Sequence, residues 1–348
     1  MKVALIIPVF NEQETLPALL QTLQDVCQKP GYEFQWIFVN DGSSDHSAEI
    51  LMARAIHDSR VRLIQFTRNF GHQAAVTAGL DYAEADAVIV MDADLQDPPE
   101  LIWQMIDKFQ EGFDIVSPQR ISRQGETKFK LWTASLFYKF MTYAVDQRLQ
   151  PQVSDFRLYS RVAVTGMRQF REQHRFLRGM AAWLGLKEAV IPFHRSARVA
   201  GSTKYNTFKM MKFAWIAISS FSVLPLRIAT WLGMTVTLLG TSYFIYTMYV
   251  RFVTGGYVPG WASLACLQII FSGAILICLG LIGDYIGRIY EELKGRPLYL
   301  IRNLVNLNPI SMPRTLVLRD DMNLRSAAES QGDSYAAPLS QERWSHQP

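Results

Sequence analysis

Short apolar runs alternate with longer amphipathic segments through the first half of the chain. Continuous aliphatic runs predict buried strands at 3–9, 36–39, 61–66 and 87–91. Apolar residues at helical spacing predict helices between these runs, at 15–27, 47–57 and 73–83. Strands that are apolar throughout and are separated by helices are typical of a mostly parallel sheet with helices on both faces. We therefore predict an α/β fold whose ligands bind at the carboxyl ends of the strands.

The second half holds two long stretches without a charged residue, at 228–250 and 252–283. Each exceeds the ~20 residues that a helix needs to cross a hydrocarbon core of ~30 Å. We predict two transmembrane helices near 228–250 and 263–284, joined by a turn that contains glycines and Pro259. Basic residues flank the outer ends of this hairpin, and that distribution favours a cytoplasmic location for both ends. A helical hairpin buried within a soluble protein is the alternative.

These patterns divide the chain into four parts. Residues 1–205 form a cytosolic α/β domain, 206–226 an amphipathic helix beside the membrane, 227–288 the transmembrane hairpin, and 289–348 a cytosolic segment that ends in a disordered tail. A core helix of the first domain explains the pattern at 206–226 almost equally well.

Composition and charge exclude several classes of protein. The chain has 348 residues, of which 49% are hydrophobic and 19% charged, so it is not a disordered chain. A net charge of +4 is too small to indicate a nucleic-acid binder. Three cysteines, two of them in the apolar half, exclude a disulfide framework and favour a reducing compartment. The first residues lack the pattern of a secretory signal, so we expect the first domain to stay in the cytosol.

Acidic residues follow the fourth predicted strand. Asp92 and Asp94 lie two positions apart, and Gln96 continues the same alternation. On an extended backbone, residues spaced by two point to the same side, and three oxygen ligands on one side suit Mg²⁺ or Mn²⁺. The alternative is that Asp92 only shapes a turn. We assign Asp97 to capping of a helix that begins near Pro98.

Asp41 follows the second predicted strand, beside Gly42, which permits a sharp turn. A carboxylate at this position can accept a hydrogen bond from the N3–H of a uracil, which would make Asp41 a residue that reads the base. Asp45, a few residues further on, is better explained as a helix cap.

Five segments, in the order in which they occur, resemble the inverting glycosyltransferases of family 2. They are Ile-Pro-Val-Phe-Asn-Glu at 7–12, Val-Asn-Asp-Gly-Ser-Ser-Asp at 39–45, Arg-Asn-Phe-Gly-His-Gln-Ala-Ala at 68–75, Met-Asp-Ala-Asp-Leu-Gln-Asp-Pro-Pro-Glu-Leu at 91–101 and Asp-Phe-Arg-Leu at 155–158. Combined with a two-helix membrane hairpin, they make the chain similar to the polyprenyl-phosphate glycosyltransferases. These are the bacterial relatives of dolichol-phosphate mannose synthase and include the bactoprenol glucosyltransferases.

The resemblance implies a GT-A type fold for 1–205 and a role for individual residues. It implies a nucleotide-sugar site made of Pro8, Val9, Asn11, Glu12, Asp41, Asp92, Ala93, Arg198, Ser202 and Lys204. It implies that Mg²⁺ or Mn²⁺ is held by Asp92, Asp94 and Gln96. It implies that the acceptor phosphate is bound by Arg120, Lys128, Lys130 and Ser135, and that the catalytic residues are Asp94, Arg120 and Asp155.

Asp155 opens the last of these motifs, and its role stays open. A phosphate monoester is already largely ionised at pH 7, because its second pKa is ~6, so a general base is not required. We expect Asp155 to orient the acceptor or the sugar hydroxyls, with base catalysis as the alternative. Among the histidines, only His72 is expected near the site, and a packing role is its alternative. Arg178 belongs to a basic group that could instead bind anionic lipid head groups.

The resemblance implies inverting transfer of a sugar, with UDP-glucose as the expected donor, to polyprenyl (undecaprenyl) phosphate at the cytosolic face of the inner membrane. The product would serve modification of cell-envelope glycans. The expected partners are the nucleotide sugar, the polyprenyl phosphate and the bilayer, without nucleic acid. We also expect a homo-oligomer, with a tetramer as a guess, in which the segment 295–302 is an exchanged strand.

Other functions remain open at this point. A processive polysaccharide synthase shares the nucleotide site but carries a Gln-x-x-Arg-Trp motif, and Gln341-Glu342-Arg343-Trp344 has the wrong spacing. A second alternative is transfer of the sugar from UDP-4-deoxy-4-formamido-arabinose or from GDP-mannose to the lipid phosphate. A membrane scaffold with a degenerate nucleotide fold is the alternative without enzyme activity.

Overall fold

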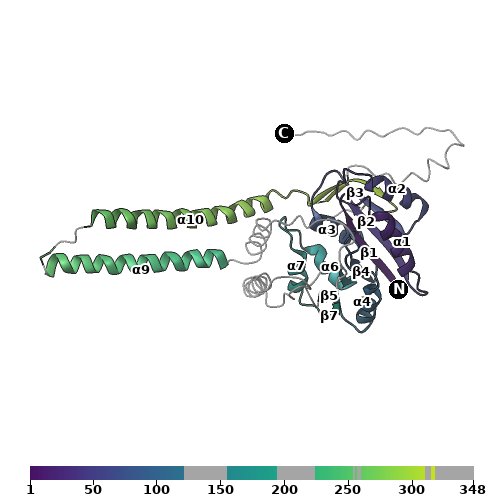
Figure 1. Cartoon of the computed structure of the whole chain (residues 1–348), viewed down its shortest axis with the longest axis horizontal. Helices are drawn as coiled ribbons and strands as arrows, with labels where there is room; N and C mark the ends of the chain where they lie inside the picture. The colour runs from purple at the N-terminus through teal and green to yellow at the C-terminus, as the bar shows by residue number, and fades with distance from the viewer. Residues whose placement is uncertain (121–154, 194–223, 254, 257–259, 310–314, 318–348) are drawn as a thin grey trace, which may run out of the picture.

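In a computed structural model, the chain forms an α/β body from which two long helices project (Figure 1). The structure describes residues 1–120, 155–193, 224–253, 255–256, 260–309 and 315–317. The predicted α/β fold is confirmed. The four-part division of the chain stays a prediction, and most of the segment 206–226 lies outside the described residues.

One sheet forms the body, and its described part has nine strands in the order β7-β5-β6-β4-β1-β2-β3-β8-β9. The strands are β1 (Lys2–Val9), β2 (Glu33–Asn40), β3 (Val61–Phe66), β4 (Ala87–Val90), β5 (Ile115–Arg120), β6 (Arg157–Ser160), β7 (Glu188–Phe193), β8 (Tyr299–Val305) and β9 (Thr315–Val317). The central strands β4, β1, β2 and β3 are parallel neighbours. In contrast, β6 runs antiparallel to β4 and β5, and β8 runs antiparallel to β3. The four predicted strands are confirmed, with small changes in their bounds.

Helices cover both faces of the sheet. One face packs against α1 (Leu16–Val26), α2 (Ser47–His57) and α4 (Leu101–Gln110). The other face packs against α3 (His72–Tyr82), α6 (Arg161–Gln169) and α7 (Leu177–Trp183). Successive residues of β1 pack alternately in the cores on the two faces of the sheet, and none of those from Val3 to Ile7 is exposed. This explains why β1 reads as a continuous apolar run rather than as an alternating one.

Helix α3, whose sequence is rich in alanine and glycine, packs against β1 with its glycine in direct contact with the strand. Every residue from Ala74 to Tyr82 is buried. A Cβ atom on Gly79 would lie 2.2 Å from Cγ2 of Ile6. The absence of a side chain at Gly79 therefore allows the helix to approach Ile6 of the strand.

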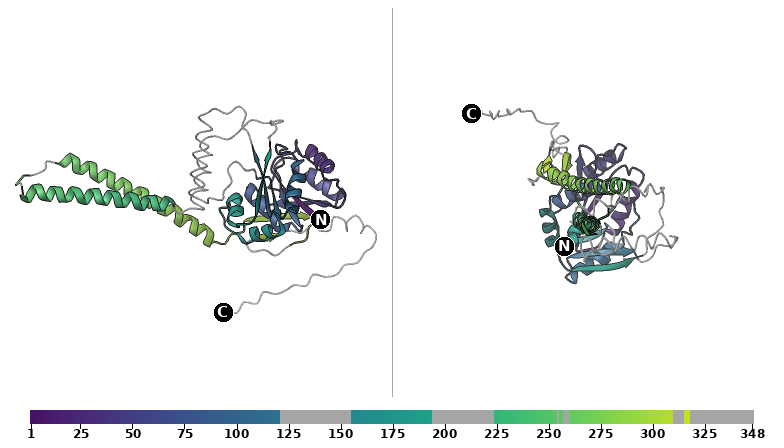
Figure 2. Two further views of the ribbon diagram at one scale, coloured as in Figure 1. Left: turned by 90° about the horizontal axis from the view of Figure 1, so that it is seen from below. Right: turned by 90° about the vertical axis from the view of Figure 1, so that its left-hand side faces the viewer.

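The projecting helices are α9 (Leu224–Val253) and α10 (Trp261–Leu293). They lie side by side, as the green ribbons of Figure 2 show, and Cys278 Sγ is 4.0 Å from the carbonyl of Ala229. At 1.5 Å per residue they are about 45 and 50 Å long, so each exceeds the hydrocarbon thickness of ~30 Å. Both are long and apolar enough to cross a membrane.

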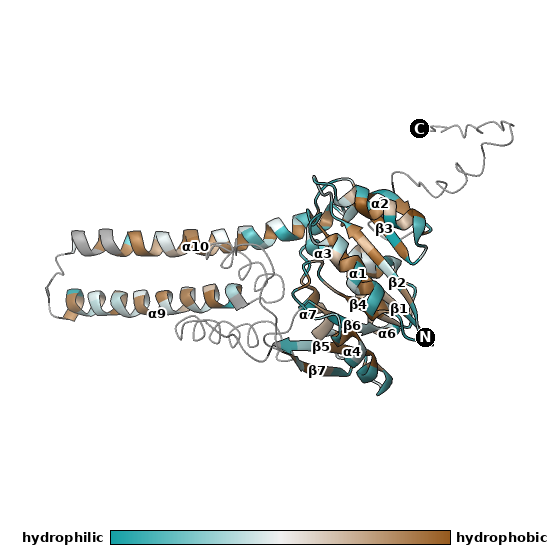
Figure 3. Cartoon of the chain, turned by 45° about the vertical axis from the view of Figure 1, so that its right-hand side comes forward, coloured by the Kyte–Doolittle hydropathy of each residue, from teal (hydrophilic) through white to brown (hydrophobic). Residues whose placement is uncertain are grey.

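The apolar side chains of the hairpin point outward rather than into a core. Leu238 on α9 is 68% exposed and Leu276 on α10 is 67% exposed. Figure 3 shows apolar residues along both helices and polar residues where α10 reaches the sheet. The structure therefore does not support the alternative of a hairpin buried inside a soluble protein.

Beyond α10 the chain returns to the sheet as β8. Tyr299 and Ile301 of this strand are fully buried, and Ile301 pairs with Phe66 of β3 in the same chain. In this single chain β8 adds to its own sheet, and the exchange of this strand between chains stays a prediction.

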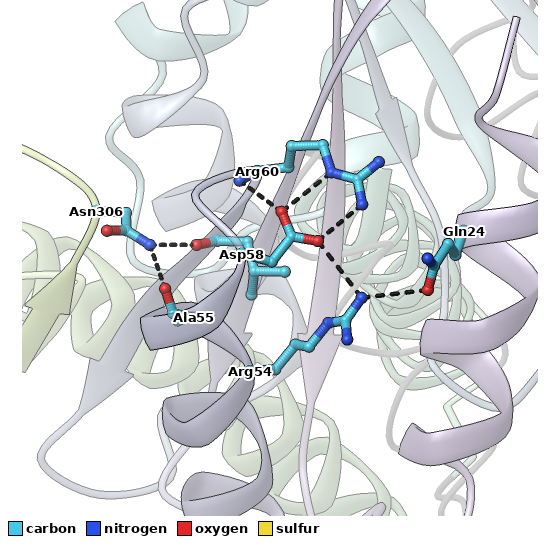
Figure 4. Close-up of polar contacts among 7 residues, drawn as sticks. Gln24, Arg54, Ala55, Asp58, Arg60 and Asn306 are labelled. Atoms are coloured by element: carbon cyan, nitrogen blue, oxygen red, sulfur yellow. Dashed lines mark hydrogen bonds and ion pairs between the residues drawn. The ribbon is translucent and has the colours of Figure 1, made fainter.

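The turn after β8 is fastened to the end of α2 (Figure 4). The amide of Asn306 donates to the carbonyls of Ala55 and Val61, at 2.7 and 2.8 Å. Beside it, Arg60 binds both oxygens of Asp58, and Arg54 bridges Asp58 to Gln24 of α1. The segment that follows the hairpin is thus an integral part of the α/β body.

Candidate functional site

Three parallel strands end at one edge of the sheet, and the loops that follow them carry the predicted site residues. β1 ends at Val9, β2 at Asn40 and β4 at Val90. Because these strands are parallel neighbours, the loops after them leave the sheet at adjacent positions. This edge is where ligands of such sheets bind.

The loops after β1 and β2 are joined by hydrogen bonds between side chains and backbone. The N–H of Asn11 donates to Ser43 Oγ at 3.0 Å, and the N–H of Ser44 donates to Asn11 Oδ1 at 2.8 Å. The N–H of Glu12 donates to Ser47 Oγ at 3.0 Å. The structure therefore brings Asn11 and Glu12, both predicted for the nucleotide sugar, against the loop that begins with Asp41.

Asp41 is buried, and both of its carboxylate oxygens accept backbone hydrogen bonds. The N–H of Phe70 donates at 2.6 Å and the N–H of Gly71 at 2.9 Å. Burial raises the pKa of the Asp41 carboxyl above its ordinary value, although the two N–H donors act in the opposite direction. Asp41 thus holds the loop after β3 in place. Its role in reading a base stays a prediction.

Gly42 makes this contact between loops possible. Its φ is +67°, and a Cβ atom there would lie 2.4 Å from the carbonyl carbon of Arg68. Only glycine combines this backbone conformation with this close approach at low cost.

Two of the residues predicted for the nucleotide sugar are core residues. Val9 is 1% exposed and Ala93 is 4% exposed, and both pack in the core between the sheet and α1. Only their main chain can face a ligand. Pro8 is partly exposed.

The segment after β4 is a turn, so the expectation of an extended backbone through Gln96 is wrong. The strand ends at Val90, and Leu95 has a positive φ of 52°. The N–H of Gln96 donates to Asp94 Oδ1 at 3.1 Å, and the Gln96 side chain is buried. A turn stabilised by Asp94, rather than the alternation of a strand, therefore orients these residues.

The assignment of Asp97 as a helix cap is also corrected. Helix α4 begins at Leu101, and the residue in the N-cap position is Glu100. Asp97 therefore lies before the cap, in the turn that leads from the sheet edge to the helix.

Asp155 lies beside Asp92 because of the register between β4 and β6. Val90 pairs with Arg157 in this antiparallel ladder. Asp92 comes two residues after Val90, and Asp155 comes two residues before Arg157, so both carboxylates reach the same edge. His72, the first residue of α3, lies between them. Its Nε2 is 3.8 Å from Asp92 Oδ1 and 4.0 Å from Asp155 Oδ2.

Arg178 of α7 completes this cluster by a bidentate ion pair. Its Nε is 2.6 Å from Asp155 Oδ1, and its Nη2 is 2.9 Å from Asp155 Oδ2. Burial acts to raise the pKa of Asp155, but the charge and hydrogen bonds of Arg178 outweigh it and lower the pKa. A carboxylate with a lowered pKa is a poor general base, which favours the orienting role over base catalysis.

Asp92 has the opposite electrostatic character. Burial, together with the charges of Asp155 and Asp94, raises its pKa to about 6, and His72 offsets part of this effect. Its side chain is still 37% exposed. A cation bound here would relieve the repulsion among the three carboxylates, so the local charge fits Mg²⁺ or Mn²⁺.

The residues that the structure describes supply few metal ligands at this position. No group of three or more His, Cys, Asp or Glu residues arranged to hold a metal ion occurs among the residues that the structure describes. Asp92 and Asp94 would therefore need further oxygen ligands, from Gln96 as predicted, from water or from a substrate.

The residues predicted for the acceptor phosphate and for the diphosphate lie at the end of β5 or outside the described residues. Arg120 ends β5, where its backbone pairs with Phe193 of β7. The remaining predicted residues for the acceptor phosphate and for the diphosphate lie outside the described residues: Lys128, Lys130, Ser135, Arg198, Ser202 and Lys204.

Two residues of the site were not predicted for these roles. Arg178 was expected only as one member of a basic group, yet it holds Asp155. Gln73 lies next to His72, and its Oε1 accepts the N–H of Leu177 at 3.0 Å. Gln73 lies inside the motif at 68–75, which was the only signal in the sequence that pointed to it.

Comparison with known proteins identifies the family. Residues 4–166 match the model of glycosyl transferase family 2, and residues 224–289 match that of the GtrB C-terminal hairpin. The chain is 42% identical to the uncharacterized glycosyltransferase YkcC of Bacillus subtilis, over 86% of this chain and 93% of that protein. It is 39% identical to the bactoprenol glucosyl transferase of Shigella phage SfII, over 89% of this chain and all of that protein.

Among solved structures, the chain is similar to glucosyl-3-phosphoglycerate synthase from Mycobacterium tuberculosis in complex with Mn²⁺, uridine diphosphate and phosphoglyceric acid. The TM-score is 0.44 at 15% identity, over 63% of this chain and 76% of that chain. The family match over the sheet, the match over the hairpin and the extent of the similarity to YkcC agree with one another. The chain belongs to glycosyltransferase family 2, as an enzyme with a GT-A type domain followed by a GtrB-type helical hairpin.

Proposed function

We propose that the enzyme transfers glucose from UDP-glucose to polyprenyl phosphate, with inversion, at the cytosolic face of the membrane. The observation that carries this proposal is the similarity to bactoprenol glucosyl transferases over nearly the whole chain, including the hairpin. Those of Shigella phages SfII, SfV and SfX are 39–40% identical over 87–89% of this chain. Bactoprenol is a polyprenyl lipid, and a membrane hairpin next to the catalytic domain suits an acceptor of this kind.

The reaction that we propose is a direct displacement at the anomeric carbon. An oxygen of the lipid phosphate forms the new bond to this carbon, and the bond from the carbon to the diphosphate breaks. The electron pair of the broken bond leaves with UDP. Because the acceptor phosphate is already largely ionised at pH 7, no proton has to be removed before it attacks.

Asp92 and Asp94 would hold Mg²⁺ or Mn²⁺, with Gln96 as a further candidate. When bound, the ion would stabilise the charge that develops on the departing diphosphate. Burial, together with the charges of Asp155 and Asp94, raises the pKa of Asp92 to about 6, and a divalent cation would offset both effects, which supports this assignment. Arg198, Ser202 and Lys204 stay proposals for the diphosphate.

Asp155 would orient the sugar or the acceptor without taking a proton. Its ion pair with Arg178 keeps it ionised and fixes both of its oxygens. His72 lies within 4.0 Å of both Asp92 and Asp155, so it would hold the metal side and the acceptor side of the site at a constant separation. Arg120, Lys128, Lys130 and Ser135 stay proposals for the lipid phosphate.

Transfer assays with the purified full chain test this function. The chain is incubated in detergent with Mn²⁺, undecaprenyl phosphate and radiolabelled UDP-glucose, UDP-4-deoxy-4-formamido-arabinose or GDP-mannose. We expect label from UDP-glucose to move into the organic phase as a single lipid product. Label that remains as a polymer at the origin of the chromatogram would support a processive synthase instead. Preferred use of another donor would overturn the assignment of glucose.

A further inference from the structure

A single segment, from Arg171 to Arg178, connects the base of the membrane hairpin to the candidate catalytic aspartate. At its hairpin end, the N–H of Gln173 donates to the carboxylate of Glu292, and Gln173 Nε2 donates to the carbonyl of Arg296 at 2.6 Å. His174 Nε2 is 2.6 Å from Glu291 Oε2. These contacts join the segment to the last turn of α10 and to the residues just after it.

The segment is anchored in the core between its two ends. Arg171 binds both oxygens of Asp81, at 2.8 and 2.7 Å. The hydroxyl of Tyr299 donates to the same carboxylate at 2.8 Å. Asp81 and Tyr299 are both buried, and Tyr299 belongs to the strand that follows α10. A buried, fully paired carboxylate thus joins α3, the segment and β8 into one unit.

At its other end the segment holds the site. The N–H of Leu177 donates to Gln73 Oε1, which fixes the start of α7 against the start of α3. The next residue, Arg178, makes the bidentate pair with Asp155. The carboxylate of Asp155 and the last turn of α10 are therefore attached to the same eight residues.

We propose that residues 171–178 form a positioning strap that sets Asp155 at a fixed place relative to the membrane hairpin, with Arg178 as the positioning residue. This inference rests on the proposed function, because it concerns an acceptor whose phosphate lies at the membrane surface. The hairpin fixes the catalytic domain relative to that surface, and a misplacement of ~1 Å at a reacting group can cost about 100-fold in rate. Because the strap has only eight residues, it couples the position of Asp155 directly to that of the last turn of α10.

The site end of the strap is tested with Arg178→Gln and Arg178→Lys in the purified full chain. For Arg178→Gln we expect kcat for transfer to undecaprenyl phosphate to fall at least about tenfold, with the KM for UDP-glucose within about twofold of the wild type. Arg178→Lys keeps the charge and should restore part of kcat. The matched control is Arg161→Gln on α6, which removes an exposed ion pair with Asp86, the residue before β4, and should leave both constants unchanged.

The hairpin end is tested with the double variant Glu291→Ala and Glu292→Ala, which removes the oxygens that accept from Gln173 and contact His174. Each variant is assayed with undecaprenyl phosphate in liposomes and with a short-chain, water-soluble prenyl phosphate. We expect the double variant to lose transfer to the lipid in liposomes and to keep transfer to the soluble acceptor, since the Arg178 pair is intact. Arg178→Gln should lose both. Glu111→Ala, which removes an exposed ion pair with Lys108, is the control.

The outcomes separate this inference from the proposed function. A wild-type chain that transfers to neither acceptor contradicts the proposed function itself. A wild-type chain that is active, with an Arg178→Gln variant of unchanged kcat, contradicts the strap. Two further outcomes would overturn the proposal, because they would show that the segment only stabilises the fold. The first is that the double glutamate variant loses transfer to both acceptors equally. The second is that Arg178→Gln changes the thermal unfolding temperature and the KM for UDP-glucose together with kcat.

Discussion

At the scale of single residues, the site depends on how two carboxylates are held close together. Asp92 and Asp155 come from two neighbouring strands, and like charges at short range disfavour ionisation of at least one of them. The two carboxylates are stabilised to different degrees. Arg178 pairs with Asp155, whereas burial, together with the charges of Asp155 and Asp94, raises the pKa of Asp92 to about 6. The unneutralised carboxylate is the one that we assign to a metal ion.

The raised pKa of Asp92 predicts that metal affinity depends on pH. A proton competes with the metal for this carboxylate below about pH 6, so the apparent Kd for Mn²⁺ should be about tenfold weaker at pH 5 than at pH 7. Calorimetric titration at constant ionic strength measures this change. In Asp92→Asn the affinity should be low at both pH values. A wild-type Kd that is the same at pH 5 and pH 7 would contradict the assignment.

Gly42 gives a second prediction at this scale. Gly42→Ala forces a Cβ atom into the backbone of Arg68, so the loop after β2 must move away from the loop after β3. We expect a loss of about 1–3 kcal/mol in the free energy of unfolding and weaker binding of UDP. Gly31→Ala is the matched control, because Gly31 also has a positive φ of 87° but has no atom within 4 Å of a Cβ. Equal effects of the two substitutions in chemical denaturation would show that the contact is unimportant.

At the scale of elements, the pattern of the sequence predicted the four parallel strands at the centre of the sheet, but not β5, β6 and β7 or the pairing of β8 with β3. The runs at β1 to β4 are apolar and lie between helices, so local periodicity is sufficient to find them. β6 is only four residues long, and β8 pairs with a strand more than 200 residues away along the chain. Periodicity within a short window contains no information about such pairing.

The same limit explains what the sequence could and could not predict about the site. The motifs pointed to Asp92 and Asp94 together, and to Asp155 separately. Their proximity follows from the β4–β6 register, and the role of Arg178 follows from where α7 packs. The turn at Leu95 was missed, because a positive φ at a leucine is rare and has no sequence signal.

The packing of α3 on β1 gives the prediction that belongs to this scale. In an exposed helix, Gly79→Ala would stabilise the protein by up to ~1 kcal/mol, but here the new methyl group meets Ile6. We expect a net loss of about 1–3 kcal/mol in the free energy of unfolding. A double-mutant cycle with Ile6→Ala provides the control, because removing the branched side chain should relieve the clash. Additive effects in that cycle would mean that the two residues do not meet.

At the scale of the whole molecule, the hairpin is inserted between strands of one sheet. The chain leaves the α/β body, forms α9 and α10, and returns to add β8 beside β3 (Figure 1). The turn at Asn306 then fastens this return to α2 (Figure 4). The catalytic domain is therefore completed by residues that follow the hairpin. The tetramer stays an untested prediction.

This arrangement predicts how the protein responds to truncation. A chain that ends at Lys294 loses β8, whose Tyr299, Ile301 and Leu304 are fully buried. Burying such side chains contributes about 1.5–3 kcal/mol each, which together approaches the stability of a typical domain. We expect this chain to be insoluble in detergent or to show no cooperative thermal unfolding. A chain that ends at Val317 keeps β8 and should unfold like the full chain. A stable, active chain ending at Lys294 would contradict the role of β8.

The mass spectrum of the lipid fraction tests the central claim most directly. The purified chain is incubated with UDP-glucose and undecaprenyl phosphate, once with Mn²⁺ and once with a chelator in excess. We predict that the lipid gains the mass of one hexose residue in the presence of Mn²⁺ and that its mass is unchanged with the chelator. A lipid of unchanged mass in both samples, or the same hexosylated product in both, would contradict metal-dependent transfer to the lipid phosphate.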